Sequence, residues 1–450
     1  MTRHLIQAHF GKADRANLAP ANTGEKATPF DIVAYDKVLD FGIGAALTDL
    51  KAKKVYPSEI ALDLAVTAAH VHAADTRISR ATESEDAWTR QLRIVVPVSD
   101  VRRWTTAIPV LERMLNFLTG DRWNVQFRPR PTAFAQIVPQ ADLIVPPYTN
   151  VSLFSGGLDS LIGAIDQLEG GDIPLLVSHA SEPAVSKAQD DCYDALKTQY
   201  PKVPFDRLRT WLAFPKAFVR NVKSEDSTRG RSFLFFALGV FAGTGLRQAF
   251  VLRAPENGLI ALNVPLDALR LGALSTRTTH PFYIARWNEL LGVLGIPGQV
   301  ENLYWNQTKG EMVAGCANRS FLKRLVPTTL SCSSPTKGRW QGHPTQHCGF
   351  CLPCLIRRAS LSSIKDATIY TVPNLRAEAW DPRRATGEQI RSFQFALQRL
   401  QEHPGIEKML IHKPGPLTDN PAALDELAAV YKRGLDEVGA LLKGVRTRPS

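Results

Sequence analysis

The chain has 450 residues and carries 54 arginines and lysines against 43 aspartates and glutamates, a formal charge of +11. This length corresponds to about two or three domains, and a hydrophobic share of 44% excludes wholesale disorder, collagen-like sequence and a coiled coil. Six cysteines in so long a chain cannot form a disulfide scaffold. The positive charge favours anionic partners such as nucleotides, phosphates or nucleic acid, although many soluble proteins carry such an excess without one.

The sequence predicts no membrane segment. The N-terminus lacks the apolar core of a signal peptide. The longest uncharged apolar run, residues 232–246, is interrupted by glycines and is shorter than the ~20 residues that a bilayer span needs. We therefore expect a soluble, cytoplasmic protein.

The first third of the chain mixes helix and strand signals. Residues 1–30 are polar and aperiodic, and we expect them to form a loose lead-in. Ser58 is a good N-cap for a helix, and the alternating prolines of residues 128–131 indicate an extended domain boundary. We expect an α+β extension over residues 1–140, with helices at 59–74 and 108–118 and strands at 92–98 and 124–127.

Strands and helices alternate from residue 141 onward. Such alternation with short connections predicts a parallel sheet covered by helices on both faces, so residues 141–330 are expected to form an α/β domain. The predicted strands are 141–145, 150–154, 175–177 and 249–252, and the predicted helices are 160–167, 184–199 and 232–243.

The last part of the chain is predicted to be helical. Thr386 and Gln389 have the spacing of a capping box ahead of an amphipathic helix, and a final helix is expected over residues 422–442. We expect residues 331–370 to form a metal-binding segment and residues 371–450 to form a helical C-terminal extension.

One motif has the features of a phosphate-binding loop. An apolar strand leads into Ser155-Gly156-Gly157, and a helix follows directly. Two adjacent glycines allow positive φ angles and let backbone N–H groups approach an anion, while the helix N-terminus adds partial positive charge. Asp159 fits such a site if it holds Mg²⁺ or caps the helix. An ordinary strand–turn–helix connection is the alternative, since Ser-Gly-Gly alone is common in turns, and the motif lacks the lysine of a Walker loop.

Four of the six cysteines cluster late in the chain, at Cys332, Cys348, Cys351 and Cys354. Four thiolates can close a tetrahedral Zn²⁺ site that contributes directly to folding, and Gly349 permits the tight turn of such a knuckle. An iron–sulfur cluster is less favoured, because the fourth cysteine of a ferredoxin run is missing.

Other histidines and cysteines leave alternatives at this site. His343 and His347 could each replace Cys332 as the fourth ligand. Cys192 and Cys316 stand alone, and we expect them to be buried small residues.

The two motifs together resemble a known family of enzymes. Residues 155–160 are similar to the SGGxDS loop of the N-type ATP pyrophosphatases, the PP-loop proteins with an adenine nucleotide alpha hydrolase-like fold. With the late cysteine cluster, residues 148–365 resemble the QueC family of 7-cyano-7-deazaguanine synthases. The resemblance implies ATP-dependent adenylation of the carboxylate of 7-carboxy-7-deazaguanine, release of pyrophosphate, and attack of an amine on the acyl adenylate.

The resemblance also implies roles for individual residues. Arg231 matches an arginine at the start of a helix in QueC proteins and would neutralise phosphate charge, the alternative being a solvated helix-start residue. The four cysteines would hold Zn²⁺. The residues implied to bind ATP with Mg²⁺ are Phe154, Ser155, Gly156, Gly157, Leu158, Asp159 and Ser160, and those implied in catalysis are Ser155, Asp159, Ser160 and Arg231.

The chain departs from the QueC family in its long N-terminal region, its C-terminal extension and the loop over residues 255–281. Polar groups in that loop suggest a binding surface, because loops carry function. Glu256, Asn257, Arg277 and His280 are therefore candidates for contacting the acyl donor or acceptor. A polar loop that caps helices is the alternative.

This architecture is similar to that of the QueC-like proteins of bacterial anti-phage operons, most of all the QatC-type proteins of the Qat system. For these, the resemblance implies the same activation chemistry, and the amine could be the N-terminus of a partner protein from the same operon. Nucleic acid is a less favoured partner. Two other functions stay open, namely a PP-loop enzyme that modifies tRNA and a nucleotide-bound scaffold without catalysis.

Overall fold

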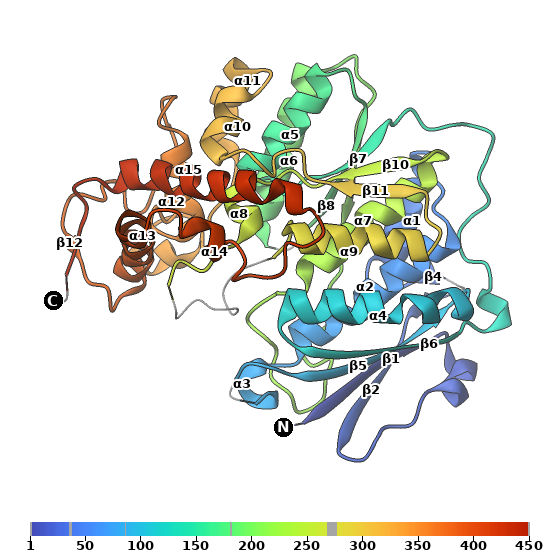
Figure 1. Ribbon diagram of the computed structural model, residues 1–450. Coiled ribbons are helices and arrows are strands. Elements are labelled where there is room, and N and C mark those ends of the chain that lie inside the picture. Colours follow the sequence, from blue (N-terminus) through green and yellow to red (C-terminus); the bar gives the residue numbers. More distant parts are fainter. Residues whose placement is uncertain (1, 36–37, 86, 181, 268–276, 449–450) are drawn as a thin grey trace.

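The computed structural model describes residues 2–35, 38–85, 87–180, 182–267 and 277–448. Two parallel β-sheets lie one above the other, with helices between them and above the upper sheet (Figure 1). The predicted α/β class with a parallel sheet at its centre is therefore confirmed. No helix in the described residues combines the length and apolar character needed to cross a bilayer.

The central sheet has five parallel strands in the order β11-β10-β7-β8-β9. Every residue of its middle strands β7 and β8 is buried, as expected for parallel strands covered on both faces. The strands are β7 (Asn150–Leu153), β8 (Pro174–His179), β9 (Asp206–Thr210), β10 (Phe250–Arg253) and β11 (Gly298–Glu301).

Helices cover both faces of this sheet. Figure 1 shows α5 (Leu158–Glu169) and α6 (Pro183–Gln199) above it, and α7 (Arg231–Gly243) and α9 (Pro281–Val293) below it. The chain runs outward from β7 to β9 and then returns to the other side of β7 as β10. This reversal places a topological switch point between β7 and β10, where open α/β sheets bind ligands at the carboxyl ends of their strands.

The second sheet lies in the N-terminal region and has the order β2-β1-β5-β6, again parallel. Its strands are β1 (Arg3–His9), β2 (Glu25–Asp31), β5 (Gln91–Val98) and β6 (Arg122–Pro129). The expected loose lead-in over residues 1–30 is therefore wrong. Strand β1 was not predicted because two of its buried residues are polar. His4 is buried against Glu83 with 3.0 Å between Nε2 and Oε2, and the Gln7 amide donates to the Ala19 carbonyl.

Helices α1 (Ile43–Ala52), α2 (Glu59–Arg77), α3 (Arg80–Glu83) and α4 (Val101–Thr119) accompany the N-terminal sheet. Ser58 caps α2 as predicted, accepting from the Ala61 N–H at 3.2 Å. Helix α4 begins earlier than predicted, because the Asp100 carboxylate caps it. Helix α2 packs against α7, so one hydrophobic core runs through both sheets.

Several predicted strand limits are corrected. Residues 141–145 form no strand, and Leu143 is 96% exposed. The Arg247 guanidinium donates to the Asp142 carbonyl of this segment at 2.8 Å. The segment lies before the central sheet and its aliphatic side chains are exposed, so the apolar run does not mark a buried strand. Strands β9 and β11 were not predicted, because short strands with charged or glycine residues give no apolar run.

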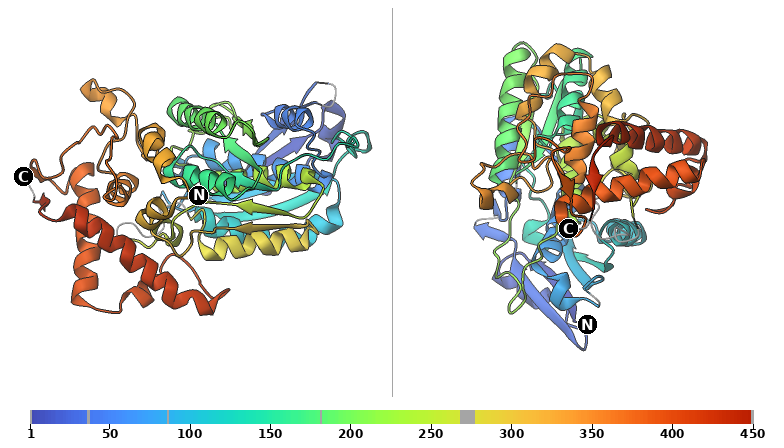
Figure 2. Two further views of the ribbon diagram at one scale, coloured as in Figure 1. Left: turned by 90° about the horizontal axis from the view of Figure 1, so that it is seen from above. Right: turned by 90° about the vertical axis from the view of Figure 1, so that its left-hand side faces the viewer.

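The C-terminal extension is helical, as predicted, and has its own core with α8 (Gly258–Leu262). Figure 2 shows it at one end of the stacked sheets. The capping box at Thr386 and Gln389 is wrong, since α13 starts at Ala385 and no side chain caps it. The remaining elements are β3 (Val33–Tyr35), β4 (Val38–Leu39), α10 (Lys309–Gly315), α11 (Arg319–Leu325), α12 (Leu352–Ser360), β12 (Ala379–Trp380), α13 (Ala385–Glu402), α14 (Glu407–Leu410), α15 (Leu424–Leu442) and β13 (Arg446–Thr447).

Candidate active site and metal centre

The predicted phosphate loop joins β7 to α5 at the switch point. Gly156 has a φ of +78°, and a Cβ there would lie 2.8 Å from the backbone nitrogen of Gln189 in α6, so glycine is required. The Ser160 hydroxyl closes the loop, because it accepts from the Ser155 N–H at 3.2 Å and donates to the Gly157 carbonyl at 3.0 Å.

The geometry of this loop suits an anion. Ser155 is exposed, while Phe154 and Leu158 are buried beneath the loop. Among the described residues no side chain caps the first turn of α5, so its N–H groups are available to a ligand. The residues present therefore fit a phosphate group.

Asp159 is buried at the start of α5 between two protein partners. Its Oδ1 lies 2.7 Å from the Lys309 Nζ, and its Oδ2 accepts from the Asn257 side-chain amide at 2.8 Å. The structure thus brings together two predicted site residues from the carboxyl ends of β7 and β10. With both carboxylate oxygens engaged, a Mg²⁺ ion at Asp159 would have to displace Lys309.

Lys309 is the site residue that sequence reasoning missed. It is the first residue of α10, whose N-terminus has a full capping box between Thr308 and Glu311. The Thr-x-x-Glu spacing is readable in the sequence and could have marked this helix start.

The C-terminal extension holds Lys309 in place. Glu437 of α15 accepts hydrogen bonds from the Thr308 hydroxyl and from the Gly310 N–H. These two residues flank Lys309, so one carboxylate fixes the backbone on both sides of the lysine. Burial raises the pKa of Glu437.

Glu256 lies next to this cluster at the end of β10. Its carboxylate accepts from the Thr279 hydroxyl, and its carbonyl accepts from the Asn302 amide at 2.7 Å. Burial, and then the charge of Asp159, raise the pKa of Glu256 to about 7. A carboxyl that titrates near neutrality can accept or release a proton.

Arg231 is the first residue of α7 and reaches the carboxyl end of β8. Its guanidinium Nη2 lies 3.5 Å from the His179 carbonyl, and burial lowers its pKa while Glu182 opposes this shift. His179 is neutral, because burial lowers its pKa to about 3. Arg231 therefore lies at the end of β8, the strand next to β7, whose carboxyl end carries the phosphate loop.

Arg277 and His280 do not join the Asp159 cluster. The Arg277 guanidinium donates to the Phe117 carbonyl at 2.6 Å and packs on the Phe117 ring. His280 is fully buried and caps α9, accepting from the Phe282 N–H at 3.2 Å. Their predicted contact with substrate stays a prediction, whereas Thr279 between them does reach Glu256.

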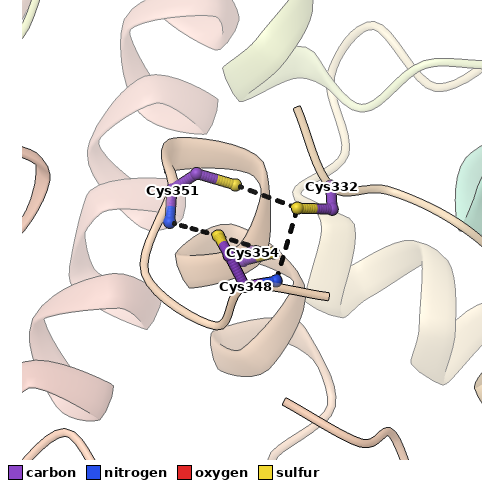
Figure 3. Close-up of side chains that lie close together, drawn as sticks. All are labelled: Cys332, Cys348, Cys351 and Cys354. Atoms are coloured by element: carbon purple, nitrogen blue, oxygen red, sulfur yellow. Dashed lines mark hydrogen bonds between the residues drawn. The ribbon is translucent and has the colours of Figure 1, made fainter. Parts of the chain in front are cut away.

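The four clustered cysteines converge as predicted (Figure 3). Their sulfur atoms all lie within 4.8 Å of one another. The Cys348 N–H points to the Cys332 Sγ at 3.4 Å and the Cys351 N–H to the Cys348 Sγ at 3.3 Å. Gly349 turns between them with a φ of +88°.

This donor set fits one metal ion such as zinc. Four sulfurs from a turn and a helix start, with N–H groups directed at them, match a structural tetrahedral site. His347 is no competitor to Cys332, since its Nε2 accepts from the Ser331 N–H at 3.1 Å. His343 is exposed and lies outside the cluster.

The metal centre and the phosphate loop are joined by two residues. Leu330 donates its N–H to the Gly156 carbonyl at 2.9 Å, and its own carbonyl lies 3.6 Å from where a Gly157 Cβ would sit. Ser331 connects Leu330 to the ligand Cys332. The position of the loop therefore depends on the extended segment that enters the metal centre.

The two remaining cysteines are buried, as predicted. Burial raises the pKa of both Cys192 and Cys316 to about 12. Neither offers a thiolate near neutral pH, so neither suits the sulfur transfer that a thiolating enzyme needs.

Comparison with known proteins adds no assignment. The sequence matches no family model, and neither the curated proteins nor the solved structures give a match to the chain.

Proposed function

We propose that the protein is an adenylate-forming ligase that activates a 7-deazaguanine carboxylate with ATP. The observation that carries the proposal is the open Ser-Gly-Gly loop at the switch point, with Asp159, Asn257 and Lys309 gathered beside it. An anion cradle next to a buried lysine suits a reaction that separates pyrophosphate from a nucleotide.

The reaction has two balanced steps. A carboxylate oxygen of the acyl donor attacks the α-phosphorus of ATP, and the bond to the bridging oxygen breaks to release pyrophosphate. An amine then attacks the acyl carbon and loses a proton, and AMP departs with the bonding pair. Glu256 is suited to take that proton, because its pKa is raised to about 7.

Each site residue has a role in this proposal. Ser155 and the first N–H groups of α5 hold the leaving phosphates, and Ser160 keeps the loop closed around them through its bonds to Ser155 and Gly157. Lys309 moves from Asp159 toward the phosphates as negative charge develops on them, and Arg231 acts from the β8 side. Mg²⁺, when bound, would neutralise further phosphate charge, and Zn²⁺ at the four cysteines would stabilise the fold.

The acceptor and the biological setting are part of the same proposal. We infer a role in bacterial anti-phage defence, with a partner protein's N-terminus as the amine, because the regions outside the α/β domain would offer a docking surface that ammonia does not need. Intact-mass measurement of a co-purified partner tests this, and a mass gain that requires 7-carboxy-7-deazaguanine is expected.

Exchange of labelled pyrophosphate into ATP tests the activation step. With ATP and Mg²⁺, we expect exchange that depends on 7-carboxy-7-deazaguanine. Ser155→Ala and Lys309→Met should each lower the exchange rate by about 100-fold or more. The matched control is Lys51→Met, an exposed lysine of α1. Exchange without the acid, or undiminished exchange in Ser155→Ala, would contradict the proposal.

A further inference from the structure

The segment that contains the metal centre has an unusual charge balance. Residues 312–365 contain eight arginines and lysines and no aspartate or glutamate. Two of the eight, Arg357 and Arg358, hold the segment together through backbone carbonyls. The other six are exposed, namely Arg319, Lys323, Arg324, Lys337, Arg339 and Lys365.

Three of these exposed cations line one groove, which we call the basic groove. Arg319, Lys323 and Lys365 line a shallow hollow of about 500 Å³ that is largely open to solvent, together with the hydroxyls of Ser320, Ser362 and Ser363. The lining residues come from helix α11, which lies at the top of Figure 1, and from the turn that follows α12. Arg319 ties these two segments together by donating to the Ser363 carbonyl at 3.1 Å.

The cations of the basic groove lack carboxylate partners. None of the three makes an ion pair with a described residue, unlike many arginines elsewhere in the chain such as Arg90 and Arg130. Asp366, the sequence neighbour of Lys365, accepts from the Tyr370 hydroxyl at 2.7 Å, and Glu169 accepts from the Asn318 amide at 2.7 Å, and neither forms an ion pair with a described groove residue. The positive charge of the groove is therefore available to an external anion.

We propose that the basic groove binds the phosphate backbone of a nucleic acid. Lysine, arginine and serine side chains are the usual donors to backbone phosphates. Ile364 is the only apolar residue among those that line the groove, whereas a protein partner would require an apolar centre. No aromatic side chain is found among the described residues that line it, so we expect no base stacking there and binding that is independent of sequence.

Fluorescence anisotropy with a labelled single-stranded 20-nucleotide DNA tests this inference on the full-length zinc-loaded chain. We expect binding that weakens with salt, with a log–log slope of about −2 for three phosphate contacts. The double variant Lys323→Glu/Lys365→Glu should weaken binding at least about 10-fold and flatten the slope by about 1.4.

The matched control changes the same charge elsewhere. Lys12 and Lys51 are exposed residues of the N-terminal region without an ion pair among the described residues, so Lys12→Glu/Lys51→Glu should bind nearly as the parent does. Equal weakening in both double variants would show diffuse attraction and overturn the proposal. Competition by a polyglutamate 20-mer as strong as that by DNA would instead assign an acidic protein partner to the basic groove. Absence of DNA binding at 50 mM salt would also overturn the proposal.

Discussion

Lys309 and Asp159 form an ion pair whose side chains are only 8% and 11% exposed. Such a pair has lost most of its hydration, so removing one partner leaves a buried charge without compensation. Under the proposed function, Asp159 would hold Lys309 until a phosphate group binds at the neighbouring loop.

A substitution at Lys309 should therefore affect ligand binding and stability together. Lys309→Met is expected to weaken ATP binding by about 10-fold or more and to destabilise the fold by about 3 kcal/mol through the unpaired Asp159. Titration calorimetry and urea unfolding measure the two effects. The double variant Lys309→Met/Asp159→Asn should recover much of the stability but not the binding, and loss of neither would contradict the assigned pair.

Glu256 makes a pH-dependent contribution to stability. Its folded pKa of about 7 lies above its ordinary value of 4.5, so the folded chain binds more protons than the unfolded chain between these values. The free energy of unfolding should therefore fall as pH rises through this window, by up to about 3 kcal/mol.

Urea unfolding at pH 5 and pH 8 checks this sign. The Glu256→Gln variant should lose less stability than the parent between the two values, since the glutamine cannot ionise. Thr279→Val serves as a control that removes the hydrogen bond but keeps the carboxyl. An equal loss in the parent and in Glu256→Gln would refute the raised pKa.

At the scale of elements, α15 supports the site through the residues on either side of Lys309. Glu437 fixes Thr308 and Gly310, and a Cβ on Gly310 would lie within 3.0 Å of the Glu437 carboxylate. The C-terminal extension is thus a support for the start of α10.

Glu437→Ala tests that support. It should raise the Kd for ATP about 5-fold and cost about 2 kcal/mol of stability, because a buried hydroxyl and a backbone N–H lose their acceptor. Asp436→Asn is the neighbouring control on the same helix, where the carboxylate pairs with exposed Lys432 on the protein surface. A change in stability without a change in ATP affinity would limit Glu437 to a structural role.

How far the sequence predicts these elements depends on the signal each one carries. The phosphate loop and the cysteines were readable because their chemistry needs fixed residue types at fixed spacing. Strand β1 was missed because His4 and Gln7 are polar letters whose burial depends on partners far along the chain. Lys309 was missed because its neighbour Asp159 comes from a segment that only the folded sheet brings close.

Over the whole molecule, the metal centre should both stabilise the fold and order the phosphate loop. Removing zinc with a strong chelator is expected to lower the Tm by several degrees. Because Leu330 bridges the cysteine segment and Gly156, ATP affinity should fall in parallel. Elemental analysis should give one zinc per chain, and His343→Ala should leave metal content unchanged. Unaltered ATP binding after metal loss would break the proposed link.

The packing of α2 on α7 has a consequence for the history of this chain. Helix α7 is buried almost throughout, and part of its cover is the N-terminal region. A descendant that lost residues 1–140 would expose that face to water, so we expect the loss to abolish folding rather than to leave a smaller stable protein. Because one hydrophobic core includes residues of both sheets, we expect substitutions beneath one sheet to constrain those tolerated beneath the other.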